Sequence, residues 1–292
     1  MSDRNYVTIK IICVKIRRNG DKIMEFDEKK LIEHLKKNFI LNIWFLSGLK
    51  NRQVTVVKKE GNDVLFAHKE GYYYMLKAEK EEVAKRLLEP LKSCDLLFVN
   101  EPSLIEGIKK KYDLKGIERC YQAVYVPKYL RERKDEYSKE EMEEQLAKFY
   151  LEGTDEQWQE EIKQLEKEGK HSLLIRPLDL EQKQIIFDHY DMLPEEVIGE
   201  RLEKKKIYGG FLKEELVGFI GLHQEESMGM LEVFPEYRRR GYGEELELFM
   251  IKKQLSDGAI PYCQIDEHNK KSMQLQEKIG MKLSDTLSYC LF

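Results

Sequence analysis

The most informative segment of the chain is residues 233–250, VFPEYRRRGYGEELELFM. Its pattern predicts a strand that ends at Pro235, a basic turn with two glycines, and an amphipathic helix with Leu246 and Met250 on one face. The N-terminus of a helix has unpaired backbone N–H groups and a partial positive charge, and both attract anions. Glycine also lets the backbone approach a bulky ligand closely. The segment therefore predicts a site that holds a pyrophosphate group.

A second segment lies farther along the chain, after a short apolar strand predicted at residues 260–265. There Asn269 and Ser272 open a predicted helix that closes at Gly280. Together with the pattern R-x-x-G-x-G at residues 238–243, this arrangement resembles the GNAT superfamily of N-acetyltransferases. The resemblance implies an α/β (α+β) fold with a mixed, mostly antiparallel sheet flanked by helices. It also implies acetyl-CoA as the co-substrate.

The resemblance assigns roles to individual residues. Backbone N–H groups of the turn and of the first helical residues are expected to hold the pyrophosphate. Backbone groups of the preceding strand are expected to stabilise the charge that develops on the carbonyl oxygen. An asparagine at the head of the next helix commonly contacts the cofactor in this family. The predicted cofactor-binding residues are Leu231, Val233, Arg238, Arg239, Arg240, Gly241, Tyr242, Gly243, Glu244, Asn269 and Ser272.

The catalytic side chains follow the family pattern less closely. Ser227 stands where several family members carry a general-base glutamate, and Gln276 stands where they carry a general-acid tyrosine. Glu232 is the one carboxylate in the apolar stretch 230–234, where burial would raise its pKa toward that of a useful base. We therefore predict Glu232 as the catalytic base. The alternative is that its side chain points to solvent or pairs with a basic residue.

Several other polar side chains lie near the predicted site, and the simpler interpretation of each is a structural role. Glu225 and Glu226 are expected in an exposed polar turn. Tyrosine and histidine side chains near strand ends are possible substitutes for the missing acid and base. These residues are Tyr262, Tyr289, His223 and His268.

The predicted elements divide the chain into three parts. Residues 171–292 have the order of strands and helices of a GNAT acetyltransferase domain, and residues 131–170 form a charged helical linker. Residues 1–130 repeat part of that order without an R-x-x-G-x-G turn, which predicts a degenerate GNAT-like domain that does not bind the cofactor. Two such halves resemble the glycine N-acyltransferase-like branch, which acylates amino acids and similar small amines.

The composition argues against several other classes of protein. With 292 residues and a net charge of -4, the chain has no general basic field for nucleic acid and no apolar run of membrane-spanning length. The first residues lack the apolar stretch of a signal peptide. Scattered histidines and five cysteines without C-x-x-C spacing, including Cys13 in a strand-like run, predict neither a metal site nor disulfides. A cytoplasmic location fits this cysteine usage.

These observations lead to one expected function and one alternative. We expect an acetyl-CoA-dependent N-acetyltransferase that uses no metal and acetylates the primary amine of a small-molecule acceptor by direct attack in a ternary complex. The alternative is a CoA-binding regulatory module that has lost catalysis, which the vacant family positions would also explain. No nucleic-acid or membrane partner is expected. The oligomeric state is left open, and a homodimer is one state that the sequence allows.

Overall fold

The computed structural model describes residues 28–292 except 170 and 191, so Cys13 and the rest of residues 1–27 lie outside the described part. The helices are α1 (Glu28–Leu35), α2 (Ile43–Lys50), α3 (Glu81–Leu87), α4 (Ile105–Tyr112), α5 (Lys128–Glu132), α6 (Lys139–Glu152), α7 (Asp155–Glu168), α8 (Lys183–His189), α9 (Glu195–Glu203), α10 (Tyr242–Ser256) and α11 (Lys270–Lys278). The strands are β1 (Val54–Glu60), β2 (Asp63–His68), β3 (Tyr74–Lys77), β4 (Leu97–Val99), β5 (Ile117–Tyr125), β6 (Leu174–Pro177), β7 (Ile207–Leu212), β8 (Glu215–Leu222), β9 (Met228–Val233), β10 (Tyr262–Asp266) and β11 (Met281–Leu291).

The described strands join in one sheet of eleven strands. Their order is β1-β2-β3-β4-β11-β5-β10-β9-β8-β7-β6. Neighbouring strands are antiparallel except in the pairs β3–β4 and β9–β10, which are parallel. We call β1–β5 with α1–α4 the N-terminal half, and β6–β11 with α8–α11 the C-terminal half. The mixed, mostly antiparallel sheet flanked by helices confirms the predicted fold class.

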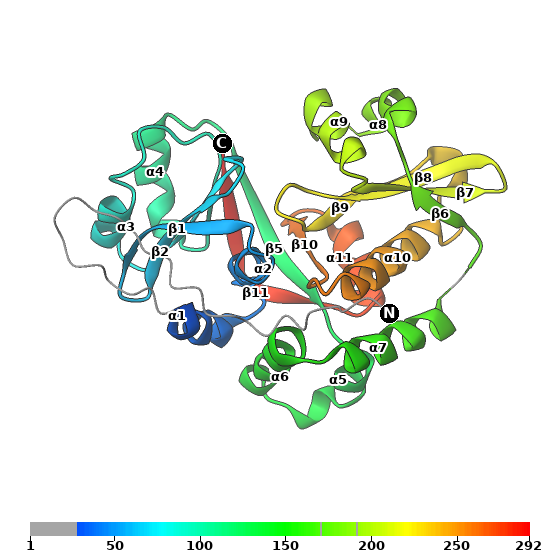
Figure 1. The fold of residues 1–292 in the computed structure, drawn as a ribbon, viewed down its shortest axis with the longest axis horizontal. Coiled ribbons are helices and arrows are strands. Elements are labelled where there is room, and N and C mark those ends of the chain that lie inside the picture. Colours follow the sequence, from blue (N-terminus) through cyan, green and yellow to red (C-terminus); the bar gives the residue numbers. More distant parts are fainter. Residues whose placement is uncertain (1–27, 170, 191) are drawn as a thin grey trace, which may run out of the picture.

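The two halves share their central strands (Figure 1). β11, the last strand of the C-terminal half, lies between β4 and β5 of the N-terminal half, and β5 in turn pairs with β10. Outward from the β11–β5 pair, the strand order is β4, β3, β2, β1 on one side and β10, β9, β8, β7, β6 on the other. The single parallel pair occupies the same position on both sides. The chain therefore consists of two halves with similar strand order, each of which completes the sheet of the other.

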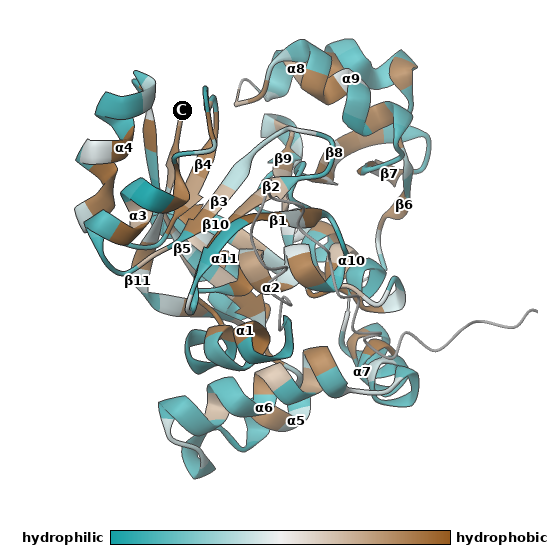
Figure 2. Ribbon diagram, turned by 60° about the vertical axis from the view of Figure 1, so that its left-hand side comes forward, coloured by the Kyte–Doolittle hydropathy of each residue, from teal (hydrophilic) through white to brown (hydrophobic). Residues whose placement is uncertain are grey.

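Helices cover the sheet with apolar side chains. In the N-terminal half α2 is buried along nearly its whole length, and its Trp44 ring lies 4.8 Å from that of Phe98. A separate core beneath α3 and α4 contains Leu97 and Val99 of β4, and a third core beneath α8 and α9 contains Phe219 of β8. In Figure 2 helices such as α4 and α6 carry both hydrophobic and hydrophilic colours, as amphipathic helices over a core should.

Residues 128–168 form three helices that are packed against the halves. Capping boxes begin both α6 and α7. The inner side of α6 is buried, and the Tyr150 hydroxyl donates to the backbone carbonyl of Tyr125 at 2.6 Å. Trp158 of α7 is buried, and its indole N–H donates to the carbonyl of Phe149 at 3.0 Å. The predicted helical character of this segment is therefore present, while the domain limits at 130 and 170 stay a prediction.

The last strand begins earlier than the sequence pattern suggests. We predict a strand at residues 287–292, whereas β11 begins at Met281. Its polar residues form a bulge, where Ser284 Oγ accepts the backbone N–H of Gln122 at 3.0 Å and donates to the carbonyl of Thr286 at 2.8 Å. A polar run that would predict a turn stays within β11, because β5 provides a hydrogen-bond partner for the Ser284 hydroxyl.

Three further findings concern the described residues only. In this part of the chain every helix is too short or too polar to cross a membrane. The same residues contain no group of three or more His, Cys, Asp or Glu side chains that could hold a metal ion. The cysteines with free thiols are Cys94, Cys120, Cys263 and Cys290.

Candidate functional site

The parallel strands β9 and β10 separate soon after they meet. They pair at one position, Met228 with Cys263, whereas β10 pairs with β5 along its whole length. Along its other edge β9 carries a bulge, and Met230 there has a left-handed φ of +52°. Backbone groups on the facing edges of separated strands lack sheet partners, and bulges often lie beside active sites. We call the place where β9 and β10 separate the opening. It borders Leu231 and Val233 of β9, the strand whose backbone groups are expected to stabilise the charge on the carbonyl oxygen.

The predicted glycine turn forms the N-terminus of α10. Gly241 precedes the first helical turn with a φ of +90°, and Arg239 is left-handed with a φ of +65°. Among the described residues no side chain caps this helix, and the first N–H in an intrahelical hydrogen bond is that of Glu245. The N–H groups of Tyr242, Gly243 and Glu244 are therefore free to bind an anion. A β-carbon at Gly243 would lie 3.7 Å from Cγ2 of Val233, which shows that the first turn packs on β9. These residues fit a bound pyrophosphate.

The acidic side chains in the first turn of α10 do not oppose an anion, because each is engaged elsewhere. Glu244 pairs with the Lys278 ammonium of α11 at 2.6 Å. Glu245 is buried, and its Oε1 accepts the backbone N–H of Leu173 at 2.7 Å. The arginines of the turn are exposed. The start of the helix therefore retains the positive character that attracts a phosphate group.

Glu232 forms an ion pair with an arginine of the turn. Arg238 Nη2 donates to Glu232 Oε1 at 2.6 Å, and Arg238 Nε donates to the carbonyl of Val233 at 2.8 Å. This arrangement matches the alternative given above, in which Glu232 pairs with a basic residue. It also changes the role expected of Arg238, whose guanidinium braces the end of β9 instead of facing an anion.

Asn269 is the N-cap of α11. Its side-chain oxygen accepts the backbone N–H of Ser272 at 3.1 Å, which is the ordinary use of asparagine at a helix start. This local hydrogen bond accounts for the spacing of the two residues in the sequence. Contact of either residue with the cofactor stays a prediction.

The corresponding place in the N-terminal half is closed. β3 and β4, the other parallel pair, stay paired at three successive positions that end at Leu76 and Val99. The chain then enters α3 through residues 77–80, which contain no glycine, and Ala78 in this link is buried. The two halves therefore share a topology but differ at the position of the opening. This difference supports the expectation that only the C-terminal half binds the cofactor.

A buried carboxylate lies at the start of β9, where the sequence predicts an exposed turn. Glu225 is 8% exposed, and its Oε1 accepts the Ser227 hydroxyl at 2.7 Å. The Tyr262 hydroxyl donates to the backbone carbonyl of Glu225 at 2.6 Å and holds the turn against β10. The prediction of exposure was therefore wrong for Glu225. Ser227, at the position of the family base, is fully buried beside this carboxylate.

The N-terminal half contributes to the environment of this carboxylate. Burial raises the pKa of Tyr73, and the charge of Glu225 adds to the effect. The Tyr73 hydroxyl has no hydrogen-bond partner among the described residues. Tyr73 lies in the β2–β3 turn, far from Glu225 in the sequence. The local sequence does not reveal the surroundings of Glu225, because Tyr73 and Tyr262 lie far from it in the chain.

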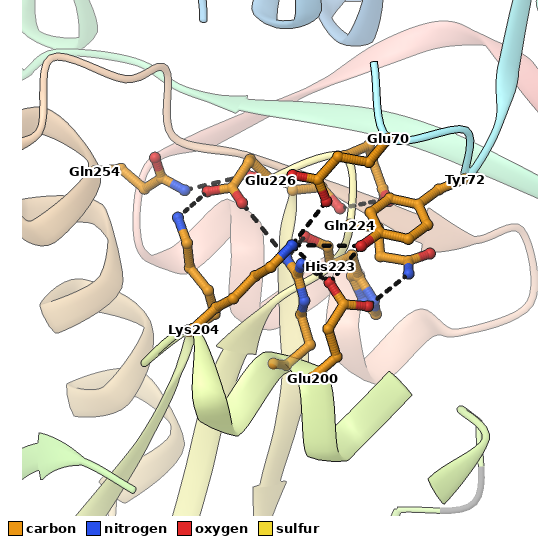
Figure 3. Close-up of polar contacts among 12 residues, drawn as sticks. Glu70, Tyr72, Glu200, Lys204, His223, Gln224, Glu226 and Gln254 are labelled. Atoms are coloured by element: carbon orange, nitrogen blue, oxygen red, sulfur yellow. Dashed lines mark hydrogen bonds and ion pairs between the residues drawn. The ribbon is translucent and has the colours of Figure 1, made fainter. Parts of the chain in front are cut away.

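Polar side chains from both halves meet beside this turn (Figure 3). Lys204, which directly follows α9, pairs with Glu70 of the β2–β3 turn and with Glu200 of α9, each at 2.8 Å. The hydroxyl of Tyr72 donates to Glu200 at 2.8 Å and accepts from Lys204 at 3.3 Å. These contacts attach α9 of the C-terminal half to the N-terminal half.

Arg201 connects this network to the β8–β9 turn. The side chain is 2% exposed and pairs with Glu200 at 2.8 Å. Its Nη1 donates to the carbonyl of His223 at 3.1 Å and lies 3.5 Å from Glu226. Lys206 also pairs with Glu226, at 2.5 Å. Because buried charges require such partners, the network fixes the turn that leads into β9.

The remaining side chains named from the sequence lie in varied surroundings. His268 is 84% exposed, and the His223 ring lies over Gly229, where a β-carbon would be 2.2 Å from Nε2. Tyr289 lines a surface pocket of about 380 Å³ beside α4, in the N-terminal half. Gln276 is 2% exposed and donates to the Glu247 side chain of α10. A role of Tyr289, His223 or His268 as catalytic acid or base stays a prediction.

Comparisons with known proteins agree with this architecture. Residues 131–281, just over half of the chain, match the Acetyltransferase (GNAT) family. A Drosophila protein of solved structure is 13% identical with a TM-score of 0.52, and the match covers 90% of this chain and 95% of that one. A GNAT-family acetyltransferase from Colwellia psychrerythraea is 13% identical with a TM-score of 0.43, covering 91% and 98%. A tandem GNAT protein from the clavulanic acid biosynthesis pathway is 10% identical with a TM-score of 0.42, covering 91% and 95%.

No curated protein matches the sequence. At these sequence identities the solved structures indicate the fold alone. The family match covers β9 and β10, the glycine turn and the capped helix α11. On this basis the chain belongs to the GNAT family of acetyltransferases.

Proposed function

We propose that this protein transfers an acetyl group from acetyl-CoA to the primary amine of a small molecule, by direct attack in a ternary complex. The observation that carries the proposal is the opening between β9 and β10 beside an uncapped, glycine-bearing helix start. The fully paired β3–β4 strands of the N-terminal half show that the topology alone does not create such an opening.

The residues of the C-terminal half offer groups for the tasks of this reaction. Backbone N–H groups of Tyr242, Gly243 and Glu244 would hold the pyrophosphate, and unpaired backbone N–H groups of β9 after Met230 would donate to the developing oxyanion. Bound acetyl-CoA would supply the activated acetyl thioester. Glu225 is the better candidate to accept the proton of the amine, since Glu232 is held by Arg238. We therefore move the proposed base from Glu232 to Glu225.

The acceptor is proposed from the resemblance to the glycine N-acyltransferase-like branch, which points to amino acids and similar small amines. The test is release of free thiol from acetyl-CoA in the presence of a panel of small primary amines. Amine-dependent release that is lost in Glu225→Gln supports the proposal. Binding of acetyl-CoA without release for any amine would favour the regulatory module that binds CoA without catalysis.

The number of cofactor sites provides a second test. Because β11 completes the sheet of the N-terminal half, the fragment 1–130 lacks a strand of its own fold, and the full chain must be used. Isothermal titration with acetyl-CoA should give one site per chain, which Gly241→Val removes. Two sites of similar affinity would show that the closed β3–β4 region also binds the cofactor.

A further inference from the structure

A carboxyl group and a carboxamide are buried together between α10 and α11. Glu247 of α10 is 3% exposed and Gln276 of α11 is 2% exposed. Gln276 Nε2 donates to Glu247 Oε1 at 2.7 Å. Together with the Glu244–Lys278 ion pair, this contact joins the first two turns of α10 to the C-terminal part of α11.

The second oxygen of each group is buried and lacks a partner among the described residues. These two atoms are Glu247 Oε2 and Gln276 Oε1. Both are acceptors when Glu247 is ionised, so an ionised pair would leave two buried acceptors unsatisfied and a buried charge without a cation. A proton on Glu247 Oε2 removes both problems, because it provides the donor that Gln276 Oε1 lacks.

We propose that Glu247 is a neutral carboxylic acid that closes a ring of two hydrogen bonds with Gln276, and that this ring positions α10 for binding of the cofactor. The positioning role rests on the proposed function. Glu247 lies four residues after Gly243 and therefore on the same side of α10, the side that packs on β9. A change at the ring is thereby transmitted to the glycine turn.

The surroundings of Glu247 favour the neutral form. Burial raises the pKa of Glu247 to about 7, although the hydrogen bond from Gln276 works in the opposite direction. The titratable side chain that faces it from β10 is the fully buried Cys263. On α10 the neighbouring charges are Glu244, paired with Lys278 of α11, and Glu245, which is bonded to a backbone N–H.

The first experiment measures the protonation of Glu247 without ligand, by urea unfolding of the full chain between pH 5 and pH 8. Glu247→Gln is the matched variant, since two carboxamides form the same ring without a titrating proton. The folded pKa lies above the ordinary value of 4.5, so wild type should lose stability relative to the variant as pH rises toward 7, and then level off. The ratio of the unfolding constants should change by roughly 50- to 100-fold from pH 5 to pH 8. A ratio that does not change with pH overturns the neutral acid.

The second experiment measures the dissociation constant of acetyl-CoA by titration calorimetry. If binding requires the neutral form, the wild-type constant should weaken about tenfold more than that of Glu247→Gln between pH 6 and pH 8. The phosphates of acetyl-CoA titrate equally in both titrations, so the comparison with Glu247→Gln removes their effect on the dissociation constant. Glu247→Leu, which breaks the ring at every pH, should bind weakly throughout without an additional pH dependence.

The outcomes separate the ring from the proposed function. Equal pH profiles of wild type and Glu247→Gln in the calorimetry, with unequal profiles in urea, overturn the positioning role and leave the neutral acid in place. If neither protein binds acetyl-CoA at any pH, the proposed function fails, while the urea experiment still decides whether Glu247 is protonated.

Discussion

Replacement of Gly241 by valine should abolish binding of acetyl-CoA while leaving the fold intact. Gly241 has a φ of +90°, a conformation that strains any residue with a β-carbon and a β-branched residue most. The strain should cost about 1 to 3 kcal/mol of stability, or move the turn to relieve it. A moved turn withdraws the N–H groups that would hold the pyrophosphate.

The expected size of the effect follows from ligand linkage. At 100 times its dissociation constant, acetyl-CoA should stabilise the wild type by about 2.7 kcal/mol. For a chain of this length that corresponds to an increase of about 5 °C in the melting temperature. The Gly241→Val variant should melt lower than wild type without ligand and show no increase with it.

Two variants control for general strain and for packing. Gly61→Val introduces a similar left-handed strain, at a φ of +60° in the β1–β2 turn, with open space around the added β-carbon. It should lower the melting temperature and keep the full shift with acetyl-CoA. Gly243→Ala meets only side-chain carbons at 3.7 and 3.8 Å, so it should change the affinity by less than about threefold. A full ligand shift in Gly241→Val would refute the assignment of the turn.

Three further predictions concern the start of β9 and the network beside it. Glu225→Gln should lower the rate of amine-dependent thiol release by about 100- to 10,000-fold, with the affinity for acetyl-CoA nearly unchanged. Glu232→Gln should keep a rate within a few-fold of wild type. If Glu232→Gln has the larger effect, Glu232 is the base. Arg201→Leu removes the buried cation that pairs with Glu200 and Glu226, although Lys204 and Lys206 still pair with these carboxylates. It should cost about 1.5 to 3 kcal/mol in urea unfolding, so a loss below 1 kcal/mol would show that the Arg201 contacts are dispensable. Burial by itself would raise the pKa of Glu200, but hydrogen bonds, first among them that from Lys204, lower this pKa to about 2. The stability that this carboxylate contributes should be present above pH 4.5 and lost as pH falls toward 2, and Glu200→Gln, compared in acid unfolding, should not show that loss.

Features that depend on neighbouring residues could be predicted from the sequence. The glycine turn before α10 and the Asn269 cap of α11 form within one helical turn, since their geometry depends on backbone preferences and on hydrogen bonds over three or four residues. The order of strands and helices follows from the same local patterns. The resemblance that these motifs carry was sufficient to predict the fold class, while the pyrophosphate role of the turn stays a prediction.

Features that depend on distant residues were decided by the tertiary structure. The Ser284 bulge stays within β11 because the Ser284 hydroxyl accepts the backbone N–H of Gln122. Gln122 lies 162 positions away in the sequence, so no local pattern indicates this partner. Glu232 and Glu225 are both glutamates near the ends of β9, yet an arginine pairs with the first, whereas the second is buried in a turn that the Tyr262 hydroxyl holds from 37 positions away. The exchange of β5 and β11 between the halves has the same origin. Burial and pairing depend on which parts of the chain meet in the fold, and no local stretch of sequence contains that information.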